Sequence, residues 1–151
     1  PLKCIEVFDR ISRRIERSGS ANFHERADLT SSRQKLVKSA VVLADQLKAD
    51  AMLVFTVRGN MARHAASFRP RYSPIVAICE FHGVADSLAL NWGVHPFVHA
   101  FDHHHPERTI ESAIKALVQE GRLRVGNTVV VVSAISAGEQ IIEVVEMRTV
   151  A

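Results

Sequence analysis

Short apolar runs along the chain alternate with longer amphipathic segments. Runs rich in Val, Ile and Phe that are bounded by turn residues predict buried strands, and apolar residues spaced three and four apart predict helices. Two of the predicted helices are followed by a glycine, which commonly ends a helix. In chain order, the predicted elements are the strand Met52–Thr56, the helix Asn60–Phe68, the strand Ile75–Cys79, the helix Val84–Trp92, the strand His95–Phe101, the helix Ile110–Glu120 and the strand Thr128–Ala134.

This alternation predicts an α/β fold. Strands joined through a helix make right-handed crossovers and lie parallel in one sheet, with helices on both faces. The last connection differs, because Ser133–Gln140 is too short to hold a crossover helix. We therefore expect Ile141–Met147 to return as an antiparallel strand, and its Glu143 and Glu146 suit the edge of the sheet. The predicted architecture is a three-layer α/β fold with a five-stranded, mostly parallel sheet.

The amino-terminal segment has a different pattern. Residues Leu2–Arg17 predict an amphipathic helix whose apolar face needs another surface to cover it. The segment Ser18–Asp28 has no apolar period and several turn formers, which is typical of a linker. Ser31 and Gln34 have the spacing of a capping box, so a second helix is expected to continue from there to about Ala49. The apolar face of the first helix comprises Cys4, Phe8, Ile11 and Ile15.

Composition excludes several classes of function. The chain has 151 residues, enough for one domain with a real core, and its 47% hydrophobic and 23% charged content is ordinary for a globular protein. The net charge of +3 is dispersed, which argues against a nucleic-acid partner. No apolar run approaches the ~20 residues that cross a bilayer, so we expect no membrane association. Cys4 and Cys79 are far apart in sequence, which favours a reducing compartment.

The turn after the first predicted strand is the candidate binding site. Ligands of open α/β sheets bind beyond the carboxyl ends of the strands. Gly59 allows a tight turn, Asn60 could cap the following helix, and free N–H groups there favour an anion. Arg58 and Thr56 could add hydrogen bonds to a phosphate, although the same residues also fit a capped turn with an exposed arginine. The candidate effector and phosphate-binding site comprises Thr56, Val57, Arg58, Gly59, Asn60 and Met61.

Other conspicuous side chains favour structural explanations. His103, His104 and His105 follow Asp102, and three consecutive histidines cannot all face one metal ion, so a solvated loop is favoured. Trp92 lies at a predicted helix end, where partial burial in the core is commoner than stacking on a ligand. The other histidines are scattered, and no Ser/His/Asp triad can be assigned. We predict neither a metal site nor a catalytic centre in this chain.

Several separated stretches, in the correct order, resemble the C-terminal α/β domain of pyruvate kinases. The family pattern is a strand, a T-x-x-G turn, a helix, an R-P step and an apolar strand, followed by L-x-x-G-x-x-P and G-x-x-x-x-G-D-x-V-x-V. The front of the chain resembles the P-x-x-A-V segment and last helix of the family's catalytic barrel. The matching stretches are Thr56–Arg63, Ser67–Arg71, Pro74–Ala77, Leu90–Pro96, Gly121–Val132 and, at the front, Pro1–Arg17.

The resemblance implies that residues 1–18 are the last helix of the catalytic barrel, 19–30 a linker and 31–151 the C-terminal domain. It implies a glycolytic enzyme, cytoplasmic or plastid, that transfers phosphate from phosphoenolpyruvate to ADP with Mg²⁺ and K⁺. The catalytic groups of this family lie in the barrel, so this chain alone should contain no catalytic residue and no cofactor. The implied partners are its own barrel domain, further copies in a homo-oligomer, and a sugar-phosphate or nucleotide effector.

Two departures from the family pattern bear on the effector. Arg58 and Met61 stand where many effector-regulated members have hydroxyl residues, and the loop Ala134–Gly138 is short and lacks the glycine-rich, arginine-bearing form. Fructose 1,6-bisphosphate is therefore disfavoured, and a different phosphorylated effector, or none, is open. Two alternatives are a free-standing phosphometabolite-binding protein of the same fold and a small enzyme that uses Arg58 and nearby histidines. The leading helix favours the pyruvate kinase domain, because a free-standing domain has no need of it.

Overall fold

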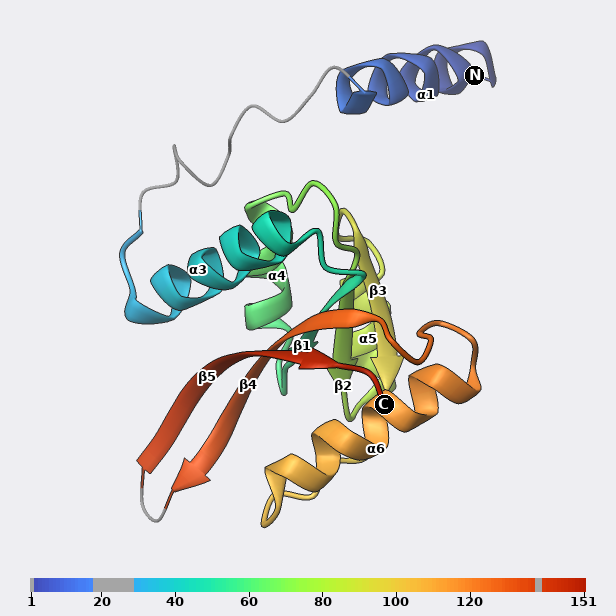
Figure 1. The fold of residues 1–151 in the computed structure, drawn as a ribbon. Helices are drawn as coiled ribbons and strands as arrows, with labels where there is room; N and C mark the ends of the chain where they lie inside the picture. Colours follow the sequence, from blue (N-terminus) through green and yellow to red (C-terminus); the bar gives the residue numbers. More distant parts are fainter. Residues whose placement is uncertain (1, 18–28, 138–139) are drawn as a thin grey trace.

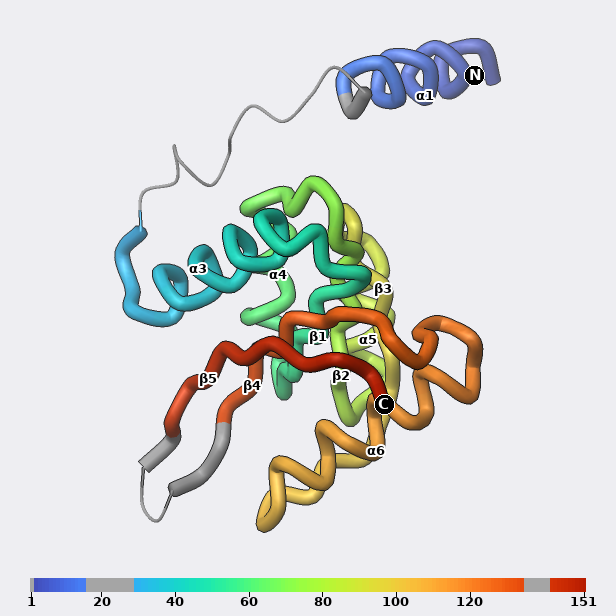
Figure 2. The backbone as a smooth tube through the Cα atoms, in the orientation of Figure 1, coloured from blue at the N-terminus to red at the C-terminus, as the bar shows by residue number. Residues whose placement is uncertain are grey.

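The computed structural model describes residues 2–17, 29–137 and 140–151, and Figures 1 and 2 show the course of the chain. Five helices and five strands are formed within these residues. In chain order they are α1 (Leu2–Arg17), α3 (Ser32–Leu47), β1 (Ala51–Phe55), α4 (Asn60–Ser67), β2 (Ile75–Cys79), α5 (His82–Leu88), β3 (Val94–Val98), α6 (Pro106–Gln119), β4 (Thr128–Ala137) and β5 (Gln140–Thr149).

The strands form one sheet in the order β3-β2-β1-β4-β5. The pairs β1 with β2, β1 with β4 and β2 with β3 are parallel, whereas β4 and β5 pair antiparallel. The central strand β1 is in register with both neighbours, since Leu53 pairs with Val76 on one side and with Val131 on the other. The predicted five-stranded sheet with a reversed last strand is confirmed.

Helices cover both faces of the sheet, as predicted (Figure 1). Buried side chains of α3, α4 and α5 pack on one face in a cluster that includes Val41, Ala65 and Leu88. On the other face, α6 contributes Ile110 and Leu117 to a second buried cluster. Alternate residues of each parallel strand enter opposite clusters, and all five residues of β1 and of β2 are buried. The continuous apolar runs in the sequence arise from this two-sided burial.

The ends of α3 follow from local chemistry. Ser31 is the N-cap, its side chain accepts the N–H of Gln34, and the Gln34 side chain accepts the N–H of Ser31 in return. This confirms the predicted capping box. Lys48 ends the helix in the left-handed conformation, with φ at 50°. The chain then turns directly into β1.

The structure shortens one predicted helix and one predicted strand. Helix α5 ends at Leu88 and not at Trp92, because the Asn91 side chain donates to the carbonyls of Ser87 and Leu88 at the helix end. Trp92 is 39% exposed, and its ring lies under the guanidinium of Arg69 at 4.6 Å. Trp92 is thus exposed and belongs to neither core cluster, so the partial core burial expected for it is wrong, and its ring is covered in part by Arg69.

Strand β3 ends at Val98 and not at Phe101, because its partner β2 ends at Cys79, the residue that pairs with Val98. In contrast, β4 continues beyond Ala134 to Ala137. Most of the segment expected to be a loop before the last strand is thus a strand, and Gly138 lies outside the described residues. The extension pairs only with β5, since β1 stops pairing with β4 at Val132.

Ion pairs hold the edge strand β5 to helices on both faces. Arg148 contacts Glu107 in the first turn of α6 at 2.6 Å and Glu146 on its own strand at 2.8 Å. The hydrogen bond from Arg148 holds the pKa of Glu107 below its usual value. On the other face, Arg33 of α3 pairs with Glu143. Both glutamates of the edge strand, expected only to suit an exposed edge, are therefore half-buried and paired.

The burial of α6 generates the first prediction, because a buried leucine contributes through its packing and an exposed one does not. Leu117 is fully buried between α6 and the sheet, whereas Leu90 is 92% exposed. The variant Leu117→Ala is expected to lower the free energy of unfolding by about 2–5 kcal/mol. Leu90→Ala, the same chemical change at the surface, should lower it by less than about 0.5 kcal/mol. Urea denaturation followed by circular dichroism measures both, and equal losses would contradict the assigned packing.

Candidate functional site

Thr56, the first residue after β1, holds the start of the turn. Its N–H donates to the carbonyl of Ile78 on β2 at 2.9 Å, and its hydroxyl oxygen accepts the N–H of Gly59 at 3.0 Å. The residue is buried, with 5% of its surface exposed. The hydroxyl oxygen of Thr56 therefore closes the turn from within, and its own proton remains available to an acceptor.

Gly59 has a conformation that glycine alone adopts easily. Its φ is 84°, in the left-handed region where a Cβ atom is strained. A Cβ built there would also lie 3.0 Å from Nη1 of Arg63 and 3.2 Å from Cδ2 of Leu88. The glycine of the predicted turn is thus required both by backbone geometry and by close packing.

Gly59 is also the N-cap of α4, which corrects the role expected for Asn60. No side chain of the described residues caps this helix, and Asn60 is its first helical residue. In the first backbone hydrogen bond of the helix, the N–H of Arg63 donates to the carbonyl of Gly59 at 3.0 Å. The N–H groups of Asn60, Met61 and Ala62 precede that bond and have no intrahelical acceptor.

Arg63 ties the turn together, and sequence reasoning missed it. Its Nη1 donates to the carbonyl of Arg58 at 3.1 Å and to Oδ1 of Asn60 at 3.3 Å, and its Nη2 donates to the hydroxyl of Ser87 at 3.0 Å. The signal was an arginine one helical turn after the glycine, where its side chain reaches back over the helix start. Arg63 links the turn to α5 and adds a second cation beside Arg58.

The six predicted site residues divide by exposure. Val57, Arg58 and Asn60 are exposed. Thr56, Gly59 and Met61 are buried, and the Met61 side chain packs in the core with α3 and α4. A ligand at this turn would therefore meet the side chains of the first group but only backbone N–H groups of Met61.

A cavity of about 350 Å³ adjoins the turn. The chain leaves β1 for β2 through α4 on one face of the sheet and returns to β4 through α6 on the other face. The cavity therefore lies at the point where the strand order reverses, between the carboxyl ends of β1 and β4, which is the usual ligand position in an open α/β sheet. Its lining residues are Phe55, Val57, Phe101, Asp102, His103, Pro106, Thr109, Ile110, Ser133 and Ala134.

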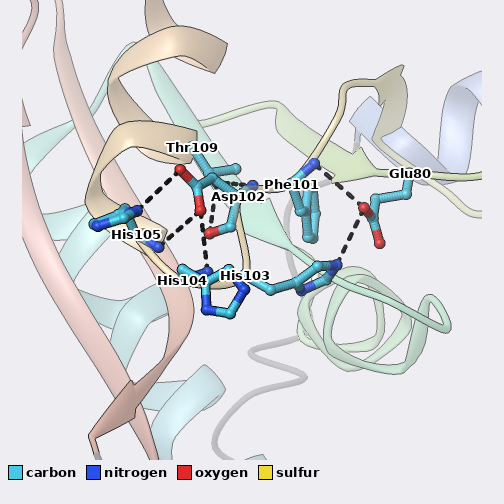
Figure 3. Close-up of polar contacts among 7 residues, drawn as sticks. All are labelled: Glu80, Phe101, Asp102, His103, His104, His105 and Thr109. Atoms are coloured by element: carbon cyan, nitrogen blue, oxygen red, sulfur yellow. Dashed lines mark hydrogen bonds and ion pairs between the residues drawn. The ribbon is translucent and has the colours of Figure 1, made fainter.

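The lining is largely apolar, with polar groups on one wall. The rings of Phe55 and Phe101 lie 6.0 Å apart and form an aromatic wall. The loop between β3 and α6 supplies the polar side chains of Asp102 and His103 to the lining (Figure 3). Sequence reasoning missed the cavity, because its walls come from strand ends that only the folded sheet brings together.

Asp102 organises the loop before α6 (Figure 3). Its Oδ1 accepts the N–H groups of His104 and His105 at 3.0 and 2.9 Å, and its own N–H donates to the Thr109 hydroxyl at 2.7 Å. Partial desolvation of this carboxyl opposes its ionisation, but the bonds from His105 and His104 prevail and lower the pKa of Asp102. The exposed positions of His103, His104 and His105 agree with the predicted solvated loop.

Within the described ranges, no three His, Cys, Asp or Glu side chains are grouped so that they could hold a metal ion. No helix in the same ranges has the length and apolarity to cross a membrane.

The chain is similar to pyruvate kinases over most of its length. The family model described as "Pyruvate kinase, alpha/beta domain" matches residues 34–145. Pyruvate kinase 2 of Synechocystis sp. is 29% identical over 91% of this chain, which spans 23% of that protein. The chloroplastic pyruvate kinase isozyme A of Nicotiana tabacum is 29% identical over 95% of this chain and 26% of its own length. The chain thus spans about a quarter of the relatives it matches.

The fold agrees with a solved member of the same family. The structure of Cryptosporidium parvum pyruvate kinase in complex with ADP has a TM-score of 0.73 and 22% sequence identity, and the match covers 83% of this chain and 25% of that one. The sequence motifs, the sheet order and the family match over residues 34–145 lead to one conclusion. The chain belongs to the pyruvate kinase alpha/beta domain family, the C-terminal domain of those enzymes.

Proposed function

We propose that this chain is the regulatory and assembly part of a pyruvate kinase, and that it binds a phosphorylated effector at the carboxyl edge of its sheet. The parent enzyme would transfer phosphate from phosphoenolpyruvate to ADP in glycolysis. The observation that carries the proposal is the turn Thr56–Met61, in which unpaired helix N–H groups, Arg58 and Arg63 lie next to a cavity at the strand switch point.

The chemistry of the turn supports an anionic group on the effector. The first N–H groups of α4 need acceptors, and the positive end of the helix dipole favours negative charge there. Arg58 is exposed beside these donors, and its carbonyl is held by Arg63 at 3.1 Å. Val57 is shared between the turn and the cavity, so a ligand with a phosphate at the turn can extend its remaining part into the cavity. A sugar phosphate and a nucleotide both have this form.

Helix α1 supports the assignment of residues 1–18 to the end of a catalytic barrel, with 19–30 as linker and 31–151 as the C-terminal domain. Its large apolar side chains are exposed, from 42% for Val7 to 71% for Phe8. A helix with such a face requires another surface. The catalytic domain of the parent enzyme is the natural partner, because the chain spans about a quarter of its relatives.

The edge strand β5 supports assembly into a homo-oligomer. It is the last strand of the sheet and pairs on one side with β4, so its other side presents unpaired backbone groups. Ile142 and Met147 on this strand are 43% and 54% exposed. An apolar edge strand of this length is commonly covered by a second strand, and a second copy of the chain supplies one.

The metal ions and the cellular location that we propose are those of the parent enzyme. Mg²⁺ and K⁺ would be bound by the catalytic barrel, where the ligands of this family lie, and not by this chain. We place the parent enzyme in the cytoplasm or in a plastid. One relative, that of Nicotiana tabacum, is described as chloroplastic. The two free cysteines, Cys4 and Cys79, agree with a reducing compartment.

The effector site generates a binding prediction. Sulfate is expected to shift the amide resonances of Asn60, Met61 and Ala62, and Arg58→Ala should weaken its binding by about three- to fivefold, since the arginine is exposed and its charge is screened. Arg124→Ala is the matched control, because it removes an exposed arginine from the opposite edge of the sheet, between α6 and β4. It should leave sulfate binding unchanged.

A second variant tests the backbone conformation of the turn separately from the charge of Arg58. Gly59→Ala places a Cβ atom 3.0 Å from Nη1 of Arg63 in a backbone conformation with φ at 84°. It should lower the free energy of unfolding by about 1–2 kcal/mol and weaken sulfate binding as well. If millimolar sulfate and sugar phosphates shift no resonance between Thr56 and Arg63, the effector assignment fails.

The exposed face of α1 generates a prediction about assembly. Phe8→Asp places a charge in the middle of the apolar face and should shift the purified chain from oligomer toward monomer, or release α1 from the domain it covers. Arg10→Asp makes a comparable change on the opposite face of the helix and should have little effect. Sedimentation velocity measures the mass, and hydrogen exchange measures protection of α1. A wild-type chain that is monomeric, with α1 unprotected, would contradict the proposed docking role.

The assignment also predicts what the chain does not do. Phosphoryl transfer requires positioned cations and metal ions around the transferred group, and those groups belong to the barrel in this family. The purified chain should therefore show no turnover with phosphoenolpyruvate, ADP, Mg²⁺ and K⁺ in a lactate dehydrogenase-coupled assay. Turnover that persists after removal of contaminating kinase, and that is lost in Arg58→Ala, would favour the small-enzyme alternative.

A further inference from the structure

The loop from Phe101 to His105 forms one wall of the carboxyl-edge cavity, and two carboxylates anchor it (Figure 3). Phe101, Asp102 and His103 all line the cavity. Glu80, after β2, holds one end of the loop, and Asp102 holds the end that enters α6. The position of this wall therefore depends on groups that ionise.

The first anchor joins the loop to the end of β2. One oxygen of Glu80 accepts the N–H of Phe101 at 3.3 Å and lies 3.3 Å from Nε2 of His103. The side chain of Glu80 is 19% exposed, whereas that of His103 is 67% exposed. The His103 ring also lies 6.2 Å from the ring of Phe101. A single carboxylate oxygen thus receives a backbone donor and an imidazole from the same wall.

The second anchor lies within the loop. Oδ2 of Asp102 lies 3.2 Å from Nδ1 of His105, and Oδ1 accepts the N–H groups of His104 and His105. Thr109 of α6 receives the N–H of Asp102, so the anchor is fixed to the helix. Each carboxylate of the wall is therefore matched with one imidazole.

The charge of this wall depends on those imidazoles. Among the residues that line the cavity, Asp102 and His103 are the ones with an ionisable side chain, and there is no lysine or arginine. Carboxylates are charged at neutral pH, whereas a histidine side chain carries a positive charge only when it is protonated. The wall is therefore net negative when both imidazoles are neutral and becomes neutral when both are protonated.

Other ionisable groups near His103 do not cancel the dependence of the wall's net charge on protonation of the imidazoles. The ionisable groups around His103 are Glu80 from the segment after β2 and Asp102, His104 and His105 from its own loop. From the first turn of α6, Glu107 is already paired with Arg148 at 2.6 Å, and Arg108 is exposed. Protonation of His103 and His105 therefore neutralises the negative charges of Glu80 and Asp102.

We propose that the loop Phe101–His105, one wall of the cavity, responds to pH. Protonation of His103 and His105 completes ion pairs with Glu80 and Asp102 and allows an anionic ligand to enter the cavity. The ion pairs tighten the wall, and cancellation of the carboxylate charge removes the repulsion of an anion. The effect on a ligand rests on the proposed effector function, whereas the response of the wall to protons does not.

The wall is tested first without a ligand. In the wild-type chain, the amide resonance of Phe101, which is bonded to Glu80, should titrate together with the ring resonances of His103 between about pH 8 and about pH 5.5. His103→Gln keeps a side-chain donor but has no titrating charge, so the Phe101 amide should no longer follow pH in this range. A Phe101 amide that titrates identically in His103→Gln overturns the proposal.

The ligand arm uses sulfate, which stays a dianion throughout this range, so any pH dependence belongs to the protein. Binding is followed on the resonances of Phe55, Phe101 and Thr109. Sulfate should bind about fivefold more tightly at about pH 5.5 than at about pH 8, since a partly exposed ion pair contributes a factor of this size. His103→Gln should reduce that ratio to about twofold or less.

His104→Gln is the matched control, because His104 lies in the same loop but does not line the cavity, and the described contact of this residue is made by its backbone N–H. It should retain the pH dependence of the wild-type chain. Loss of that dependence in His104→Gln to the same extent as in His103→Gln overturns the specific role of His103. Absence of sulfate binding on the cavity resonances at both pH values overturns the admission of an anion, and the ligand-free titration then decides the response of the wall by itself. The proposed effector function fails separately, if sulfate shifts no resonance between Thr56 and Arg63.

Discussion

The pairing of β1 on both of its edges is the constraint on which the rest of the domain depends. Strand β1 is parallel to β2 on one side and to β4 on the other, and all five of its residues are buried. The connections to these two neighbours pass over opposite faces of the sheet, and a cavity lined in part by the start of α6 lies at the carboxyl end of β1. The turn Thr56–Met61 and the cavity both lie there, so one pairing pattern positions the whole candidate site.

A few hydrogen bonds in the turn fix the start of α4 relative to β1 and β2. Thr56 bonds to β2 and receives the N–H of Gly59, and Arg63 returns to the carbonyl of Arg58. The left-handed φ of Gly59 lets the chain reverse within this space. The first N–H groups of α4 have no intrahelical acceptor, as at any helix start, and with Gly59 as the N-cap no side chain of the described residues caps them.

The sequence predicted the parts of the molecule that depend on local patterns. The parallel strands, the reversed last strand, the capping box at Ser31 and the glycine turn all follow from periodicity and residue type. The early end of α5 depends on hydrogen bonds from the Asn91 side chain to carbonyls three and four residues before it, which hydrophobic periodicity does not reveal. The length of β4 depends on its pairing with β5. The cavity could not be predicted, because Phe55, Phe101 and Ser133 meet only when the strand order is known.

The two sides of the carboxyl edge differ in charge, and this difference restricts how a ligand can lie across it. Arg58 and Arg63 lie at the turn, whereas Asp102 and the neighbouring Glu80 lie at the wall of the cavity. At neutral pH an anionic group is favoured at the turn and disfavoured in the cavity, so the apolar lining of Phe55 and Phe101 suits the uncharged part of the same ligand. In the proposed wall, an anionic group that enters the cavity is favoured once protonated His103 and His105 form their ion pairs with Glu80 and Asp102.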